Sequence, residues 1–299
     1  MSKTAVCPMC GLDYDPEDGL VHDEKDGEQL CYDCTMKIRN AVPEELGGAP
    51  TMEEPPSVNC FTVKSAKAVL NVLDPVKGVL GKDADLIVRT EENGLSIAMA
   101  DQGGVSEIEV SVDLKHENII DHDTGRAYVC VPLDKLINAL KTFGSDESVT
   151  IAAQDSEIIL QSNMATWRIP QIRMDGTRKK LHAVTIDSDA DATVTVQALK
   201  RILAAEYMAE VFKVTVEDRV LKMTAEAESG REGLTVREFQ TVTADFPVSS
   251  QFGYDLMKDI FSRIHTDGGV DMGLMNRGPM ELEWRQGAAG IRAVFAPRD

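Results

Sequence analysis

The chain of 299 residues has few aromatic side chains, no long apolar run and too few basic residues to balance its acids. Since a helix needs about 20 apolar residues to cross a bilayer, we expect no membrane span. The first residues, MSKTAVCPMC, lack the apolar centre of a signal peptide, so we expect a cytoplasmic protein. The net charge of −19 argues against a simple DNA-coating protein, because non-specific affinity for DNA comes from neutralising its phosphates.

Catalytic signatures are also missing. The sequence contains no P-loop, no GxGxxG after a predicted strand and no nucleophile motif. Its five histidines are scattered, and the Asp-His-Asp run at 121–123 is more typical of a polar loop than of a metal site. We therefore expect a binding protein and not an enzyme.

Four of the six cysteines form two C-x2-C pairs, Cys7 with Cys10 and Cys31 with Cys34, separated by twenty residues. Each pair can present two thiolates from one tight turn, and two such turns complete a tetrahedral site for Zn2+. Four protein ligands leave no open position for water, so the predicted zinc ion is structural. Disulfides or a redox site are disfavoured by a cytosolic setting and by the lack of a βαβ pattern around these cysteines.

The N-terminal region is strongly acidic, with thirteen Asp or Glu against four Lys or Arg in residues 1–58. We predict a zinc-ribbon-like module over 1–40 that docks other proteins, since a net charge of −9 suits a phosphate backbone poorly. A zinc-ribbon transcription regulator would need a basic ribbon instead. Residues 41–57 are rich in Pro, Gly and Glu without apolar periodicity, which predicts a flexible acidic linker.

One pattern occurs four times after residue 58: an apolar helix with lysine or arginine, followed by two strands around a tight turn. Apolar residues at helical spacing predict these helices over 64–80, 133–142, 196–207 and 254–264. Pro75 inside the first helix predicts a kink or an early end. We therefore predict an α+β fold with two repeated domains, 58–172 and 193–299, joined by a connector at 173–192.

The predicted helices carry positive charge within an acidic chain. With their flanking residues they hold ten Lys or Arg against five Asp or Glu, which leaves the rest of the chain at −24. Lysines on one amphipathic helix are usually a solvated face, but segregation onto one kind of element gives the protein a directional field. The bias is weakest in the fourth helix, where Asp255 and Asp259 balance Lys258 and Arg263.

Four segments, in order, resemble the PCNA-type sliding clamps of archaea, eukaryotes and their viruses. They are ENGLSIAMADQGGVSEIEV (Glu92–Val110), VPLDKLINALK (Val131–Lys141), SSQFGYDLMKDIF (Ser249–Phe261) and the C-terminal VFAPRD (Val294–Asp299). The resemblance covers residues 58–299. The cysteine module is not part of the usual pattern of that family.

The resemblance implies a homotrimeric ring of two-domain subunits, with antiparallel sheets outside and two helices per domain lining the hole. It implies a DNA polymerase processivity factor that encircles duplex DNA and that works with a clamp loader and with replication and repair proteins. Its place would be the nucleoid of an archaeal cell or a viral host cell. The DNA-facing candidates are Lys64, Lys67, Lys77, Lys135, Lys141, Lys200, Arg201, Lys258 and Arg263.

Two further sites follow from the same resemblance. Edge strands near 163–169 and 211–216 would pair between subunits, with contacts from Met164, Trp167, Ile169, Phe212 and Val214. A groove for partner peptides would lie between the connector and the C-terminal tail, at Ile172, Met174, Leu181, Ala296 and Pro297. The alternative is an acidic clamp-like adaptor that binds partners through the zinc module and never encircles DNA.

Overall fold

The computed structural model describes residues 59–298 except for stretches at 92–93, 124–126, 155, 173–184, 231 and 239–241, together with four short strands near the N-terminus. The chain divides into two compact units, Met1–Glu54 and Pro55–Asp299.

The first unit contains two antiparallel strand pairs. Strand β1 (Ala5–Val6) pairs with β2 (Asp13–Tyr14), and β3 (Val21–His22) pairs with β4 (Gln29–Leu30). The predicted linker at 41–57 lies outside the described residues.

The first half of the second unit alternates strands with two helices. Helix α2 (Ala66–Leu80) follows the first strand, and helix α3 (Leu133–Leu140) follows the sixth. The strands are β5 (Asn59–Val63), β6 (Asp85–Glu91), β7 (Gly94–Ala100), β8 (Ser106–Asp113), β9 (Ile119–Asp123), β10 (Ala127–Pro132), β11 (Val149–Ala153), β12 (Glu157–Gln161) and β13 (Thr166–Pro170).

The second half has helix α4 (Val196–Ile202), which continues into the short 3-10 helix η1 (Leu203–Ala205), and helix α5 (Tyr254–Phe261). Its strands are β14 (Ala190–Thr195), β15 (Val211–Glu217), β16 (Val220–Glu226), β17 (Gly233–Glu238), β18 (Val242–Ala244), β19 (Val248–Gly253), β20 (Gly269–Leu274), β21 (Met280–Gln286) and β22 (Ala289–Phe295). Strand β14 begins three residues before the predicted domain start at 193. Each of the helices α2, α3, α4 and α5 is followed by an antiparallel hairpin, as the sequence pattern predicts.

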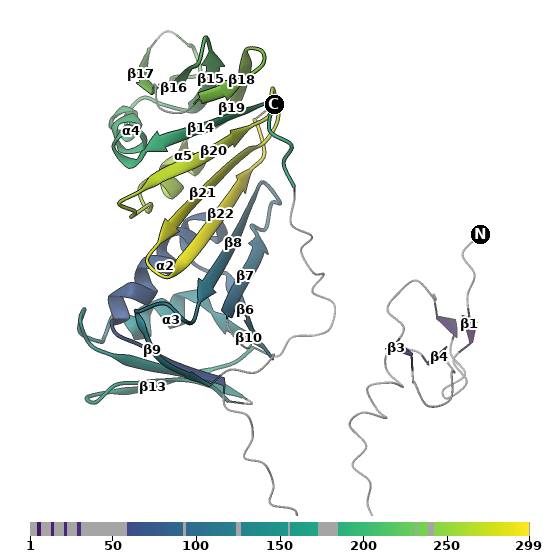
Figure 1. The fold of residues 1–299 in the computed structure, drawn as a ribbon, viewed down its shortest axis with the longest axis vertical. Coiled ribbons are helices and arrows are strands. Elements are labelled where there is room, and N and C mark those ends of the chain that lie inside the picture. Colours follow the sequence, from purple (N-terminus) through teal and green to yellow (C-terminus); the bar gives the residue numbers. More distant parts are fainter. Residues whose placement is uncertain are drawn as a thin grey trace, which may run out of the picture. The chain divides into compact units, whose positions relative to one another are not determined.

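The described part of the second unit contains three antiparallel sheets, and one of them is built from strands of both halves. The largest sheet has nine strands in the order β10-β6-β7-β8-β22-β21-β20-β14-β18 (Figure 1). A five-stranded sheet has the order β13-β12-β11-β5-β9, and a four-stranded sheet has the order β17-β16-β15-β19. The halves meet where β8 pairs with β22, in a register that runs from Val112 opposite Ala289 to Ser106 opposite Phe295.

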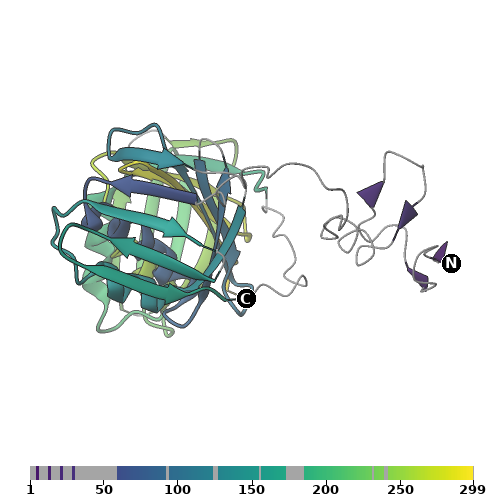
Figure 2. The same cartoon turned by 90° about the horizontal axis from the view of Figure 1, so that it is seen from below.

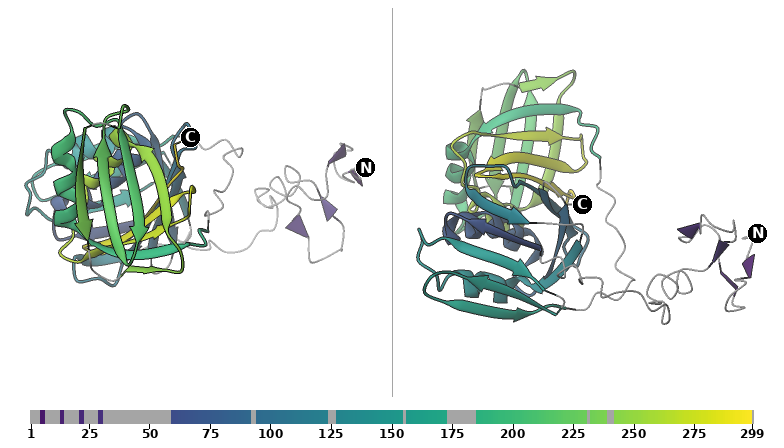
Figure 3. Two further views of the ribbon diagram at one scale, coloured as in Figure 1. Left: turned by 90° about the horizontal axis from the view of Figure 1, so that it is seen from above. Right: turned by 60° about the horizontal axis from the view of Figure 1, so that its bottom comes forward.

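The helices gather on one side of the second unit, and its C-terminal end lies on the other side (Figures 2 and 3). Two of them begin at a hydroxyl cap, because Ser65 Oγ accepts the N–H of Ala68 at 3.4 Å and Thr195 Oγ1 accepts the N–H of Ala198 at 3.1 Å. No helix in the described part of the chain is long and apolar enough to span a bilayer.

Aromatic side chains are concentrated in the core of the second half. Phe212 on β15 and Phe261 on α5 are fully buried, with ring centroids 5.3 Å apart in an edge-on arrangement. Tyr254 begins α5, and its hydroxyl donates to the carbonyl of Leu203 at 3.2 Å or of Ile202 at 3.3 Å. Burial, with Glu206 nearby, raises the pKa of Tyr254.

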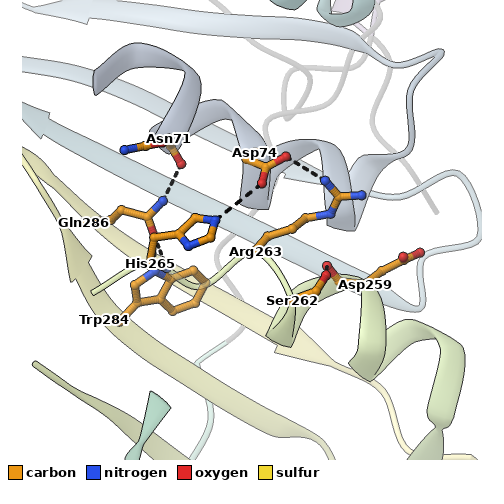
Figure 4. Close-up of polar contacts among 8 residues, drawn as sticks. All are labelled: Asn71, Asp74, Asp259, Ser262, Arg263, His265, Trp284 and Gln286. Atoms are coloured by element: carbon orange, nitrogen blue, oxygen red, sulfur yellow. Dashed lines mark hydrogen bonds and ion pairs between the residues drawn. The ribbon is translucent and has the colours of Figure 1, made fainter. Parts of the chain in front are cut away.

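Helix α2 passes through Pro75 and continues to Leu80, so the predicted early end is wrong. Proline has no N–H to donate to the carbonyl of Asn71 one turn earlier. Gln286, on β21 in the other half, donates its side-chain amide to that carbonyl instead (Figure 4). The Gln286 Oε1 accepts the N–H of His265 at 3.0 Å and the Nε1–H of Trp284 at 3.1 Å. Both the nitrogen and the oxygen of this buried amide are therefore hydrogen-bonded.

Gln286→Leu should lower the free energy of unfolding by about 2–4 kcal/mol, because each buried polar group left without a partner costs about 1–3 kcal/mol. Urea denaturation measures the loss. Pro75→Ala returns a backbone N–H to the Asn71 carbonyl, so the double variant Pro75→Ala/Gln286→Leu should recover part of the stability. Equal stability of Gln286→Leu and the double variant would contradict this account of the helix.

Candidate nucleic-acid interface and partner groove

Six of the predicted DNA-facing cations are exposed on or beside the helices. The helices themselves bury apolar residues, such as Leu73 and Val76 on α2 or Leu136 and Ile137 on α3. Among the described residues, none of the six has an ion-pair partner. They are Lys64, Lys67, Lys135, Lys141, Lys200 and Arg201.

The remaining three predicted cations, Lys77, Lys258 and Arg263, are half-buried. Lys258 on α5 forms an ion pair with Glu206, and this bond to Glu206 raises the pKa of the lysine. Arg263 follows α5 and donates from Nη1 to Asp74 Oδ1 on α2 at 2.6 Å. Both side chains therefore have an internal carboxylate that would compete with DNA phosphate.

Arg263 lies against helix α2 at Gly78 (Figure 4 shows the Arg263–Asp74 pair). A Cβ at position 78 would stand 2.7 Å from Arg263 Cδ, so only glycine leaves room for this side chain. His265 Nε2 lies 3.9 Å from the other oxygen of Asp74. Together with Gln286 and Asn71, these contacts join the helix side of the first half to that of the second half.

Side chains alternate between the two faces of a strand, so Glu281 and Glu283 on β21 lie on the face of the nine-stranded sheet opposite the helices. On this face Arg292 lies among three carboxylates: its Nη2 is 2.5 Å from Glu281, its Nη1 is 3.3 Å from Glu109, and its Nε is 3.7 Å from Glu283. Burial lowers the pKa of Arg292, but its bonds to Glu281 and Glu109 outweigh that effect and raise it. Burial and the neighbouring Glu281 raise the pKa of Glu283.

The strand predicted to contact another subunit in the first half is an edge strand. Among the described strands, β13 pairs only with β12, at one end of the five-stranded sheet. Met164, in the turn before it, is 90% exposed, and Trp167 is 44% exposed with its Nε1 donating to Thr142 Oγ1 at 2.8 Å. Ile169 on the same strand is buried, so it contributes to the core instead of the edge.

The predicted edge in the second half is wrong. Strand β15 pairs with β16 on one side and β19 on the other, so its backbone has no unpaired edge. Phe212 and Val214 are fully buried there and belong to the core. Strand β17 is an edge of this sheet, at the opposite end of the unit from β13 (Figure 1).

A groove of about 500 Å³ lies beside the C-terminal tail and contains two of the predicted partner residues, Ala296 and Pro297. The N–H of Ala296 donates to the carbonyl of Val105 at 2.8 Å, which ties the tail to the loop between β7 and β8. Val105 is 45% exposed and lines the groove with Leu256 of α5. Sequence reasoning missed Val105 and Leu256, since only the tertiary contact places them beside the tail.

The other predicted groove residues are placed in part. The N–H of Ile172 donates to the carbonyl of Cys130 at 2.9 Å, which continues the chain from β13 along β10. Met174 and Leu181 lie outside the described residues. So do the predicted zinc ligands Cys7, Cys10, Cys31 and Cys34. Within the residues that are described, no three His, Cys, Asp or Glu side chains are arranged to hold a metal ion.

No family model and no curated protein sequence matches the chain. Solved structures do match it. The chain is similar to the A. fulgidus PCNA bound to the C-terminal region of FEN-1, with a TM-score of 0.71 and 14% identity over 81% of this chain and 98% of that one. It is similar to the PCNA of Entamoeba histolytica, with a TM-score of 0.70 and 13% identity over 81% of this chain and 99% of that one.

A third match is a chain of the PCNA2–PCNA3 complex from Sulfolobus tokodaii, with a TM-score of 0.68 and 13% identity over 80% of this chain and 99% of that one. These matches establish the fold: the chain has the fold of the PCNA-type sliding clamps. At this level of identity they establish the fold alone.

Proposed function

We propose that this protein is a DNA sliding clamp, a homotrimeric ring that encircles duplex DNA and tethers a DNA polymerase and other clamp-binding proteins. A clamp loader would place it on DNA, and it would serve replication and repair without catalysing a reaction. Its fold supports the proposal. The observation that carries it is the pairing of β8 with β22, which joins the two halves of the unit.

The two halves have matching strand orders, which supports the interpretation that they are repeated domains. The series β10-β6-β7-β8 corresponds to β19-β15-β16-β17, and β13-β12-β11-β5-β9 corresponds to β22-β21-β20-β14-β18. Helices α2 and α3 then correspond to α4 and α5. In this correspondence β17 is the counterpart of β8, and β13 is the counterpart of β22.

The ring would close through these counterparts. Within the chain β8 pairs with β22, whereas β17 and β13 are both edges, at opposite ends of the unit (Figure 1). We infer that β17 of one subunit pairs antiparallel with β13 of the next. A contact between two different edges is heterologous, and it closes into a ring when the rotation between subunits divides a full turn. Three subunits would give six repeated domains around the hole.

DNA would pass on the helix side of this ring. The exposed lysines and Arg201 would contact phosphates without reading sequence, so the ring could slide along the duplex. The carboxylates around Arg292 lie on the opposite face of the sheet and would keep DNA away from the outside. Retention would come from encirclement and not from affinity, which suits a chain with a net charge of −19.

The groove at Val105, Leu256, Ala296 and Pro297 is the proposed site for partner peptides. Its apolar side chains suit the apolar anchors of such a peptide. The A. fulgidus clamp that this chain resembles holds the C-terminal region of FEN-1.

The N-terminal module is proposed to hold one structural Zn2+ through Cys7, Cys10, Cys31 and Cys34. In sequence, the first pair falls between the paired strands β1 and β2, and the second pair follows directly after β4. A C-x2-C pair can present two thiolates to one ion, and two pairs complete a four-thiolate site.

A second candidate is an acidic adaptor with a clamp fold that binds partners through the zinc module and does not form a ring. The charge of −9 in residues 1–58 favours this function, because that region would bind protein more readily than DNA.

Light scattering should give a mass three times that of the 32.7 kDa chain. Trp167→Glu should shift the protein to monomers, because it places a charge in the proposed contact between β13 and β17. Tyr207→Glu is the matched control, since Tyr207 is also an exposed aromatic residue but lies on neither edge strand. A monomeric unmodified protein would favour the adaptor instead.

Encirclement predicts retention that depends on DNA ends. Protein that has threaded onto a linear duplex fixed at one end should stay bound after the free end is blocked, and should leave when the end is opened. Lys67→Ala/Lys135→Ala should flatten the plot of log K against log salt by about 0.9 for each phosphate that is no longer neutralised. Lys115→Ala/Lys213→Ala removes equal charge away from the helices and should leave the slope unchanged. If the protein stayed on the DNA equally long with the free end blocked and with it open, the ring would be refuted.

Metal analysis of the full chain should find about one Zn2+ per chain, as expected for a four-thiolate site. Cys7→Ser/Cys31→Ser should lose the metal, because each substitution removes one thiolate from a different pair. Cys60→Ser should keep it, since Cys60 is a free cysteine on β5. Zinc retained by the first variant would rule out these ligands.

A further inference from the structure

The C-terminal tail after β22 is held by two backbone hydrogen bonds to different parts of the unit. The N–H of Ala296 donates to Val105 in the first half, and the N–H of Arg298 donates to the carbonyl of Gln251 on β19 at 2.7 Å. Pro297 between them has no N–H to contribute. Chain ends usually fray unless something ties them down, and here the tail forms one wall of the groove.

The Arg298 side chain adds two further contacts. Its Nη1 donates to the carbonyl of Glu210 at 3.3 Å, and its Nη2 lies 3.2 Å from Glu228 Oε1. The same Glu210 carbonyl accepts the N–H of Tyr254, the first residue of α5, at 3.1 Å. The guanidinium therefore ties the tail to the start of α5, and both line the groove.

Glu228 is the carboxylate partner of Arg298. It lies in the turn between β16 and β17, where the N–H of Ala227 donates to Glu232 at 3.0 Å and the N–H of Gly230 donates to Ala227 at 2.8 Å. Gly230 in this turn has φ 64°, a conformation that a side chain would strain. Glu228 does not line the groove, whereas Arg298 does, so a substitution of Glu228 acts on the groove only through the arginine.

We propose that Arg298 is a positioning residue for partner binding: by holding Glu210 and Glu228, it fixes Ala296 and Pro297 as a wall of the groove. The inference rests on the proposed clamp function, because it assigns to that groove a partner peptide with apolar anchors. A guanidinium suits this role, since its fork can bond a carbonyl and a carboxylate at once. Without it, the described residues of the tail keep only the two backbone bonds of Ala296 and Arg298.

The first test measures the tail itself in the full-length protein. Hydrogen exchange at the Ala296 and Arg298 amides should speed up in Glu228→Ala and in Arg298→Ala, whereas Glu232→Ala, an exposed acid in the same turn, should leave it unchanged. In the double variant Glu228→Ala/Arg298→Ala these amides should exchange no faster than in Arg298→Ala, because both substitutions break the same contact between Arg298 and Glu228. Unchanged exchange in Glu228→Ala and Arg298→Ala would overturn the anchoring.

The second test measures binding of a fluorescent peptide from the C-terminal region of FEN-1. Both Glu228→Ala and Arg298→Ala should weaken it by about twofold to tenfold, as expected for an exposed ion pair with added hydrogen bonds. Trimer mass should not change, and Arg298→Lys should restore only part of the affinity. Faster exchange with unchanged affinity would overturn the positioning role. No binding by the unmodified protein would instead overturn the proposed groove, while the exchange data would still report on the anchor.

Discussion

The structure depends on one set of backbone hydrogen bonds, the antiparallel ladder between β8 and β22. It joins β8 of the first half to the last strand of the chain and so makes one nine-stranded sheet from two halves. Among the described strands, β13 pairs only with β12 and β17 pairs only with β16, so each leaves one edge unpaired at an end of the unit. A protein with two such edges must protect them or use them, and the proposed ring uses both in the same kind of ladder.

The junction of the halves is reinforced on the helix side by polar contacts. Gln286 supplies the donor that Pro75 removes, and Arg263 reaches Asp74 across Gly78. These contacts hold α2 close to the end of α5, so they also set the spacing between the cations that the two helices carry. An arginine that would otherwise be available to phosphate is engaged here in joining the two halves.

Charge is sorted by the faces of the same sheet. The helices with their lysines cover one face, and the carboxylates of Glu109, Glu281 and Glu283 lie on the other around a single arginine. Burial and, after it, the neighbouring Glu281 raise the pKa of Glu283 on this face. The sorting follows from strand geometry, because alternate residues of β21 point to opposite faces.

Much of the local structure could be read from the sequence alone, because it is set by neighbours a few residues apart. Apolar spacing placed the four helices to within a few residues at most ends, and turn signals placed the hairpins after them. Such patterns do not predict which distant segments of the chain pair with each other. It made β17 an edge and β15 a central strand, buried Phe212, gave Arg263 a carboxylate partner and brought Val105 to the C-terminal tail. Those features depend on contacts between residues far apart in the chain, so only the tertiary structure decided them.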